Sequence, residues 1–117
     1  MGTGKPLRQL MHADDLARIL LWALEHLPRP DAASPAPLPL ILAGPEHSIR
    51  EVAEMVSDAS NFRGELTFDT DAVDGPLRRT ADTRVFEALC PDFAFTPLAD
   101  GIRATVEWYL KSHSSLN

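Results

Sequence analysis

Charged side chains of both signs lie close together in one turn of the sequence, within residues 68–79. Gly75 gives this turn backbone freedom, and Pro76 keeps the residue before it out of the helical region. The turn would present three charged side chains from a short, stiff loop: Asp74, Arg78 and Arg79. A carboxylate accepts hydrogen bonds from sugar hydroxyls, and a guanidinium grips phosphate with its planar fork. The alternative is a solvated turn whose charges pair locally.

Length and charge limit the classes of function that the chain can have. Its 117 residues allow one domain at most, spanning 1–117, and a domain of that size buries roughly 65% of its unfolded surface. The net charge is −6, so the chain carries no basic footprint for nucleic acid or for an anionic membrane surface. We therefore expect neither partner, and any arginine that binds a ligand must act as a local site.

Cysteine content and the N-terminus indicate the compartment. Cys90 is the only cysteine, which excludes an internal disulfide and is typical of a reducing environment. Its apolar neighbours predict a buried small hydrophobe rather than a reactive thiol. The N-terminus has no apolar signal region, and Pro6 stands where a myristoylation motif needs a small hydroxyl residue. We expect a cytoplasmic protein.

Four helices are predicted from apolar periodicity and capping residues. The first has Asp14 or Asp15 as its N-cap, the second opens with a capping box of Ser48 and Glu51, and the last follows Thr96 as N-cap. The expected helices cover residues 15–27, 48–60, 83–89 and 97–111. Both tryptophans, Trp22 and Trp108, are expected to pack, although either could lie on a face that meets another domain.

Three or four short strands are expected between these helices. The apolar and alternating runs predict strands at residues 8–12, 38–43 and 65–69. Five prolines between residues 28 and 39 predict a Pro-rich surface loop that carries no chemistry. The fold class is therefore α/β, a small set of helices with three or four strands, and too few strands for a doubly wound sheet.

Several known kinds of site are excluded by spacing. The Gly2-Thr3-Gly4-Lys5 run lacks the Ser or Thr that follows the lysine of a phosphate loop, and the next glycine is Gly44, so no dinucleotide fingerprint is present. The acids at 69–74 resemble a calcium loop, but Thr80 stands where its glutamate belongs. The four histidines have no ligand spacing for zinc. No catalytic metal or cofactor ligands are expected in this chain.

Two catalytic arrangements are also absent. Tyr109 is the only tyrosine and Ser112 and His113 follow it, so the chain cannot form a Tyr-x-x-x-Lys pair. No serine lies in a Gly-x-Ser-x-Gly elbow, and Cys90 has no visible partner for nucleophilic catalysis. The sequence predicts no catalytic residue.

The chain resembles extended short-chain dehydrogenase/reductases that act on nucleotide sugars. The resemblance lies in three runs, Gly2-x-Gly4-x-Pro6-x-Arg8, His12-x-Asp14-Asp15-Leu16-Ala17 and Thr96-Pro97-Leu98 with Gly101-Ile102. A narrower resemblance, to the GDP-L-fucose synthase family, lies in Phe68-Asp69, Asp74-Gly75 and Arg78-Arg79, strengthened by Pro91-Asp92-Phe93 and Phe95-Thr96-Pro97. It covers residues 2–113 and only the C-terminal part of that enzyme.

Members of that family use NADPH to epimerise GDP-4-keto-6-deoxy-mannose at two carbons and to reduce its ketone. The resemblance implies a substrate-binding lid without the Rossmann domain, because the family's cofactor loop and catalytic residues correspond to positions upstream of Met1. A substrate-contacting tryptophan of the family is Met1 here, and Cys90 and His12 fall at other motif positions than the family's catalytic Cys and His. The implied substrate-binding residues are Arg8, Asp74 and Arg79, with Arg78 as a weaker neighbour.

The resemblance also implies partners. NADP(H) would bind to the intact enzyme and not to this chain alone, and the partners would be a GDP-sugar and a cofactor-binding Rossmann domain or chain. We expect the chain by itself to have no reductase or epimerase activity. The alternatives are the lid of another nucleotide-sugar epimerase or dehydratase, a non-catalytic interaction module, and a truncated reading frame.

Overall fold

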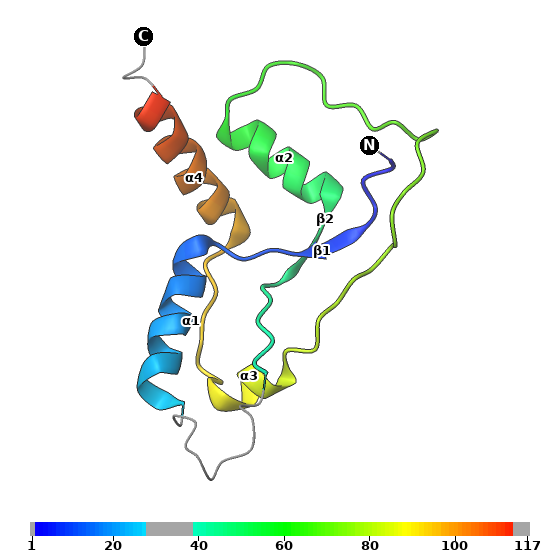
Figure 1. The fold of residues 1–117 in the computed structure, drawn as a ribbon. Helices are drawn as coiled ribbons and strands as arrows, with labels where there is room; N and C mark the ends of the chain where they lie inside the picture. Colours follow the sequence, from blue (N-terminus) through cyan, green and yellow to red (C-terminus); the bar gives the residue numbers. More distant parts are fainter. Residues whose placement is uncertain (1, 28–38, 114–117) are drawn as a thin grey trace.

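The computed structural model describes residues 2–27 and 39–113. Its elements, in chain order, are β1 (Leu7–Gln9), α1 (Ala13–His26), β2 (Glu46–Ser48), α2 (Ile49–Ala59), α3 (Arg84–Leu89) and α4 (Leu98–His113). Figure 1 shows α2 and α4 packed together on one side of the two strands, with α1 and α3 on the other. The lid-like α/β arrangement expected from the sequence is confirmed.

The two strands form a small antiparallel sheet in which Arg8 lies opposite His47. At the other edge of β1, Leu7 forms an isolated parallel bridge with Arg78. The Leu7 N–H donates to the carbonyl of Leu77 at 2.8 Å. The backbone around Arg78 therefore runs beside β1 as the third member of this layer.

Two of the predicted strands are wrong. Residues 39–43 and 65–69 have no regular structure, and residue 38 and most of the predicted Pro-rich loop lie outside the described residues. The strand predicted at 8–12 is present but shorter, and β2 was not predicted. A strand needs a neighbouring backbone for its ladder of hydrogen bonds. Within the described part of the chain, neither 39–43 nor 65–69 has such a neighbour.

The start of α1 differs from its prediction. The helix begins at Ala13, and its N-cap is His12, whose Nδ1 accepts from the backbone N–H of Asp14 at 3.4 Å. The prediction that Asp14 or Asp15 caps this helix is therefore wrong. An N-cap must precede the first turn, whereas both aspartates lie inside that turn, where their charge complements the helix dipole.

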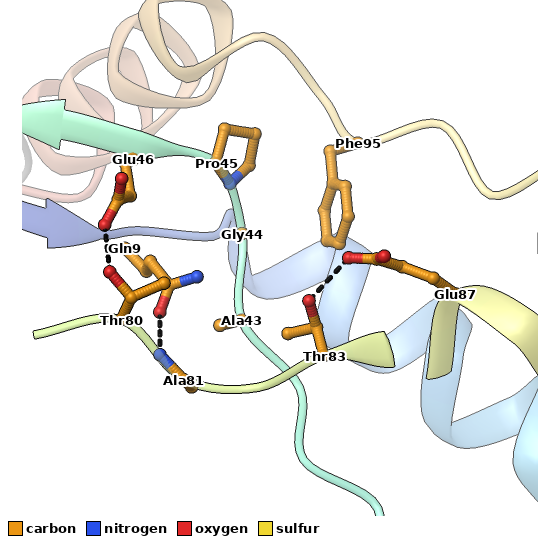
Figure 2. Close-up of a pocket in the computed structure, with 10 residues that line it drawn as sticks. All are labelled: Gln9, Ala43, Gly44, Pro45, Glu46, Thr80, Ala81, Thr83, Glu87 and Phe95. Atoms are coloured by element: carbon orange, nitrogen blue, oxygen red, sulfur yellow. Dashed lines mark hydrogen bonds between the residues drawn. The ribbon is translucent and has the colours of Figure 1, made fainter. Parts of the chain in front are cut away.

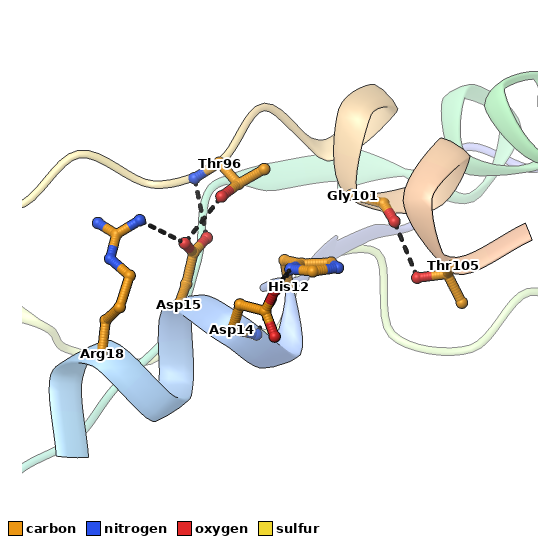
Figure 3. Close-up of polar contacts among 7 residues, drawn as sticks. All are labelled: His12, Asp14, Asp15, Arg18, Thr96, Gly101 and Thr105. Carbon is orange, nitrogen blue, oxygen red and sulfur yellow. Dashed lines mark hydrogen bonds and ion pairs between the residues drawn. The ribbon is translucent and has the colours of Figure 1, made fainter. Parts of the chain in front are cut away.

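Asp15 instead ties α1 to a distant segment, as Figure 3 shows. It is fully buried, and its two carboxylate oxygens accept from the backbone N–H and the hydroxyl of Thr96, each at 2.8 Å. The Nη1 of Arg18 lies 3.2 Å from the same carboxylate. The last helix, α4, begins at Leu98, so Pro97 and not Thr96 precedes its first turn, and the prediction that Thr96 caps it is wrong.

The capping box of α2 is confirmed. The Ser48 hydroxyl accepts from the Glu51 N–H at 3.1 Å, and the Glu51 carboxylate accepts from the Ser48 N–H at 2.7 Å. Across the fold, α4 crosses the start of α1 at Gly101. A Cβ placed on Gly101 would lie 2.9 Å from Cδ2 of His12. A side chain at this position would force the two elements apart.

Few apolar side chains are buried in the described residues. Ile19 and Phe86 are the only large hydrophobic ones that are, at 0% and 2% exposure. Phe86 makes edge contacts with three other aromatic rings: Trp22, Phe93 and Phe95. The prediction that Trp22 packs is confirmed.

Two predicted core residues are more exposed than expected. Trp108 is 64% exposed, so the prediction that it packs within this chain is wrong. Cys90 is only half-buried. Trp108 lies on α4, and Cys90 is the C-cap residue that follows α3.

The fold is open for its size. Its accessible surface is 8940 Å², against roughly 6300 Å² for a compact monomer of this mass. The chain therefore buries about half of its unfolded surface rather than the expected two thirds. Its radius of gyration is 18.3 Å, against about 13 Å for a compact chain of this length. Among the described residues, no helix has the length and apolar character needed to cross a membrane.

Candidate functional site

Arg8 on β1 lies against the charged turn at residues 74–76. Its Nη1 donates to the carbonyl of Pro76 at 3.1 Å, across 68 positions of sequence, and to the carbonyl of Leu7 at 2.6 Å. Its Nη2 would lie 3.4 Å from a Cβ placed on Gly75. Arg8 and the 74–76 turn, which both resemble substrate-binding motifs of one family, are thus adjacent in the fold.

Asp74 binds the loop that leads into β1. Its Oδ1 accepts from the Thr3 N–H at 2.9 Å, and its Oδ2 accepts from the Thr3 hydroxyl at 2.5 Å. Gly2, at φ 59°, makes this possible, because a Cβ there would collide with the Asp74 carboxylate. A backbone at positive φ also favours glycine over any other residue.

The same loop packs against an aromatic ring from the charged segment. A Cβ on Gly4, at φ 76°, would lie 2.6 Å from the ring of Phe68. The guanidinium of Arg50, in the first turn of α2, lies 3.7 Å from the centroid of that ring and donates to the Thr3 carbonyl at 3.2 Å. Arg50 is therefore a further cation near the turn.

Arg78 forms a bidentate ion pair with Glu46 on β2. Its Nε donates to one carboxylate oxygen at 2.9 Å and its Nη2 to the other at 2.6 Å. The Thr80 hydroxyl also donates to this carboxylate. These hydrogen bonds, with that of Arg78 first, lower the pKa of Glu46 below its ordinary 4.5 and raise the pKa of Arg78.

Arg79 has no such partner. It is exposed, and among residues 2–27 and 39–113 its side chain makes no hydrogen bond, ion pair or ring contact. The structure thus brings Arg8 to the 74–76 turn, binds Asp74 to Thr3, engages Arg78 with Glu46, and leaves Arg79 available to a ligand.

Sequence reasoning missed the partners that fix these side chains. Thr3 contacts Asp74 across 71 positions, and Glu46 contacts Arg78 across 32. No local spacing signals such pairs. The only local signal was the Gly2-Thr3-Gly4 run, because glycines on both sides of a residue indicate a backbone in an unusual conformation.

A cavity of about 380 Å³ adjoins Glu46, the ion-pair partner of Arg78. Figure 2 shows the residues that line it. It lies between the backbone at 43–46 and the segment 80–87, with the ring of Phe95 at one side. In its wall, the Gln9 Oε1 accepts from the Ala81 N–H at 2.6 Å, and the Thr83 hydroxyl donates to Glu87 at 2.5 Å. The cavity is therefore on the Glu46 side of the strands, away from Arg79.

No family model matches the chain. It is similar to the GDP-L-fucose synthase of Dictyostelium discoideum, at 36% identity over 98% of this chain and 35% of that protein. The probable GDP-L-fucose synthase of Drosophila melanogaster is also 36% identical, over 96% of this chain and 34% of that protein. UDP-glucuronic acid decarboxylase 1 of Xenopus tropicalis is 28% identical over 94% of this chain. The chain spans about a third of the length of the GDP-L-fucose synthases it matches.

Comparison with solved structures points to the same family. A crystal structure of a GDP-L-fucose synthetase from Naegleria fowleri matches with a TM-score of 0.82 at 36% identity, over 97% of this chain and 33% of that chain. A second structure, of that protein bound to NADP, matches with a TM-score of 0.81 at 37% identity, over 97% of this chain and 34% of that one. The chain is therefore a homologue of the C-terminal third of GDP-L-fucose synthases and belongs to that family in sequence and in fold.

Proposed function

We propose that the chain is the substrate-binding part of a GDP-L-fucose synthase, the enzyme that converts GDP-4-keto-6-deoxy-mannose to GDP-L-fucose with NADPH. The observation that carries this proposal is the contact between Arg8 and the 74–76 turn. The two segments that resemble the family's substrate-contacting motifs are far apart in the chain, and a shared binding site requires them to be adjacent.

Arg8 and Arg79 bind the diphosphate of the GDP-sugar in this proposal. Two guanidinium groups neutralise its charge and hold it in one orientation. The chain's contribution to catalysis is then positioning of the substrate rather than bond-making. The proton and hydride transfers belong to the other two thirds of the enzyme.

The resemblance implies that Asp74 and Arg78 bind substrate, but in this proposal the first role of each is to hold the structure of the site. Both oxygens of Asp74 accept from Thr3, so its first role is to hold the loop before β1. Each oxygen retains a lone pair with which it can accept from a ligand hydroxyl. Arg78 uses its fork on Glu46, and so it holds the segment that presents Arg79.

The residues of this chain do not fit NADP(H). A dinucleotide site needs a glycine-rich loop between a strand and a helix, with the cofactor phosphates at the helix N-terminus. In α1 and α2, the two described helices that follow strands, the first turn carries carboxylates instead, from Asp14 and Asp15 in α1 and from Glu51 in α2. We therefore assign the cofactor to a Rossmann domain or chain outside this sequence, and we propose a cytoplasmic location for the whole enzyme.

The exposed apolar side chains support such a partner. Leu20, Leu21 and Leu24 on α1 are 53%, 62% and 79% exposed. Trp108 and Tyr109 on α4 are 64% and 53% exposed. Together with the excess accessible surface, these exposed apolar side chains mark a candidate interaction surface, and the cofactor-binding part is the occupant that we propose.

Calorimetric titration of the purified chain with GDP-mannose and UDP-glucose tests the proposal. We expect preferential binding of the GDP-sugar, weakened at least tenfold by Arg79→Ala because a charge-assisted phosphate contact is lost. Arg84→Ala is the matched control, since Arg84 is exposed on α3 and pairs with Asp82, and it should bind as the unaltered chain does. Equal loss in both variants would contradict the assignment of Arg79.

Activity assays test the division of labour. The chain alone should not oxidise NADPH with the keto-sugar, whereas mixing it with the N-terminal two thirds of a GDP-L-fucose synthase should give turnover. Turnover by the chain alone would overturn this part of the proposal. The second candidate is the lid of another nucleotide-sugar enzyme, which the similarity to a UDP-glucuronic acid decarboxylase favours. Preferential binding of UDP-glucose would support that candidate.

A further inference from the structure

Adjacent arginines Arg78 and Arg79 lie on opposite faces of the layer formed by β1, β2 and the backbone at residues 77–80. Arg78 and Thr80 both donate to the Glu46 carboxylate, so they point the same way. In an extended segment, alternate side chains point to opposite faces. Arg79 therefore points away from Glu46.

The sheet register places Arg8 and His47 on that same opposite face. Gln9 lies across from Glu46, and Arg8 across from His47. Because successive side chains of a strand point to opposite faces, Gln9 and Glu46 lie on one face of the sheet and Arg8 and His47 on the other. The parallel bridge between Leu7 and Arg78 sets Arg79 beside Arg8 on the neighbouring backbone. Three nitrogen-bearing side chains thus form one row across three backbones: Arg79, Arg8 and His47.

None of the three side chains is engaged by a carboxylate among the described residues. Arg8 donates only to two carbonyl oxygens, and Arg79 and His47 make no side-chain hydrogen bond or ion pair there. The acids nearest in the fold have other partners. Asp74 accepts from Thr3. Glu51 accepts from Ser48, whose hydrogen bonds are the main cause of the lowered pKa of Glu51, ahead of the charge of His47.

We propose that His47 is a third ligand-binding residue, which completes a row that binds a nucleoside diphosphate through both of its phosphates. This inference rests on the proposed function and adds to it a residue that the family resemblance does not contain. Neighbouring backbones lie about 4.8 Å apart, so the row spans about 10 Å from one outer backbone to the other. Side chains from three backbones offer donors to more than one phosphate, so the two phosphates of a nucleoside diphosphate can each be bound by different members of the row.

Calorimetry of the full chain with inorganic pyrophosphate, inorganic phosphate, GDP and GMP tests this row. His47→Ala should weaken GDP and pyrophosphate binding about five- to tenfold, the value of one phosphate hydrogen bond, and leave GMP and phosphate binding within about twofold. His47→Gln keeps an N–H donor and should recover part of the loss. Circular dichroism shows whether each variant retains its helices.

Arg79→Ala and Arg84→Ala form a matched pair, because each removes one exposed guanidinium and only Arg79 lies in the row; Arg84 pairs with Asp82 at α3. Arg79→Ala should weaken pyrophosphate binding, and Arg84→Ala should leave it within about twofold. Diphosphate binding that is unchanged in folded His47→Ala would overturn the row while leaving the proposed function intact. Pyrophosphate binding that depends on His47 without any preference for GDP-sugars would support the row and contradict the proposed function. No pyrophosphate or GDP binding by the unaltered chain would overturn both.

Discussion

Asp15 on α1 and Thr96 before α4 are joined by two hydrogen bonds of 2.8 Å, although 81 positions separate them in the sequence. The Asp15 carboxylate is fully buried, and Arg18 is the cation beside it. The pair fixes the start of α1 against the segment that enters α4. Because β1 precedes α1 by only a few residues, it also sets the position of Arg8 relative to the rest of the lid.

Loss of this contact should destabilise the fold. Asp15→Ala leaves the Thr96 N–H and hydroxyl without their acceptor, and we expect the free energy of unfolding to fall by about 2–3 kcal/mol. Urea denaturation followed by circular dichroism measures the change. Asp14→Ala, at the exposed neighbouring position, should cost less than about 0.5 kcal/mol. Similar losses in the two variants would show that helix dipole effects, and not the contact with Thr96, account for Asp15.

Burial along α1 predicts unequal costs for two similar substitutions. Ile19 is 0% exposed and Leu24 is 79% exposed. Ile19→Ala should lower the free energy of unfolding by about 2–5 kcal/mol, whereas Leu24→Ala should change it by less than about 0.5 kcal/mol. If the isolated chain rearranges to cover the outer face of α1, Leu24→Ala will instead cost as much as Ile19→Ala in the same denaturation assay.

The link between Asp74 and Thr3 should control the loop before β1. Asp74→Ala removes the acceptor for both the N–H and the hydroxyl of Thr3, so we expect faster hydrogen exchange at the Thr3 amide by at least tenfold. Asp71→Ala is the control, because Asp71 is exposed in the same segment and its carboxylate has no partner within the described ranges. An unchanged exchange rate in Asp74→Ala would mean that the glycines alone hold this loop.

The Glu46 ion pair predicts a pH dependence. The pKa of Glu46 is lowered in the folded chain, first by the hydrogen bond from Arg78, so its contribution to stability is present above its ordinary 4.5 and is lost as the pH falls through the lowered value. The melting temperature should therefore drop on acidification below pH 4.5. Glu46→Gln should reduce the size of that drop, while Glu54→Gln, at an exposed position on α2, should not. An identical drop in both variants would contradict the role given to Glu46.

Helices were predicted better than strands because their signals are local. The Ser48 capping box and the apolar stripe of α2 are each formed by residues close together in the sequence. The expected range for this helix, 48–60, is therefore close to the observed Ile49–Ala59. The strands expected at 38–43 and 65–69 are wrong over their described residues, 39–43 and 65–69, because a strand depends on a distant backbone that periodicity does not reveal. For the same reason β2 was missed, although it pairs with β1.

The candidate site divides in the same way. The residue types at Arg8, Asp74 and Arg79, with the glycines around them, were readable from the sequence, since a turn chemistry and a family motif are both local patterns. Their partners were not readable, because Thr3 and Glu46 meet Asp74 and Arg78 only through folding.

By itself, the sequence determined the helices, the turn at residues 74–76 and the charged residues around it, because these follow from backbone preference and short-range spacing. Only the tertiary structure decided which partner each charged side chain contacts and to which face of the layer it points. The alternation of side chains across a three-backbone layer turns Arg78 toward Glu46 and Arg79 away from it, toward the face of Arg8 and His47. That choice depends on strand register, which is set by contacts between segments that are far apart in the chain.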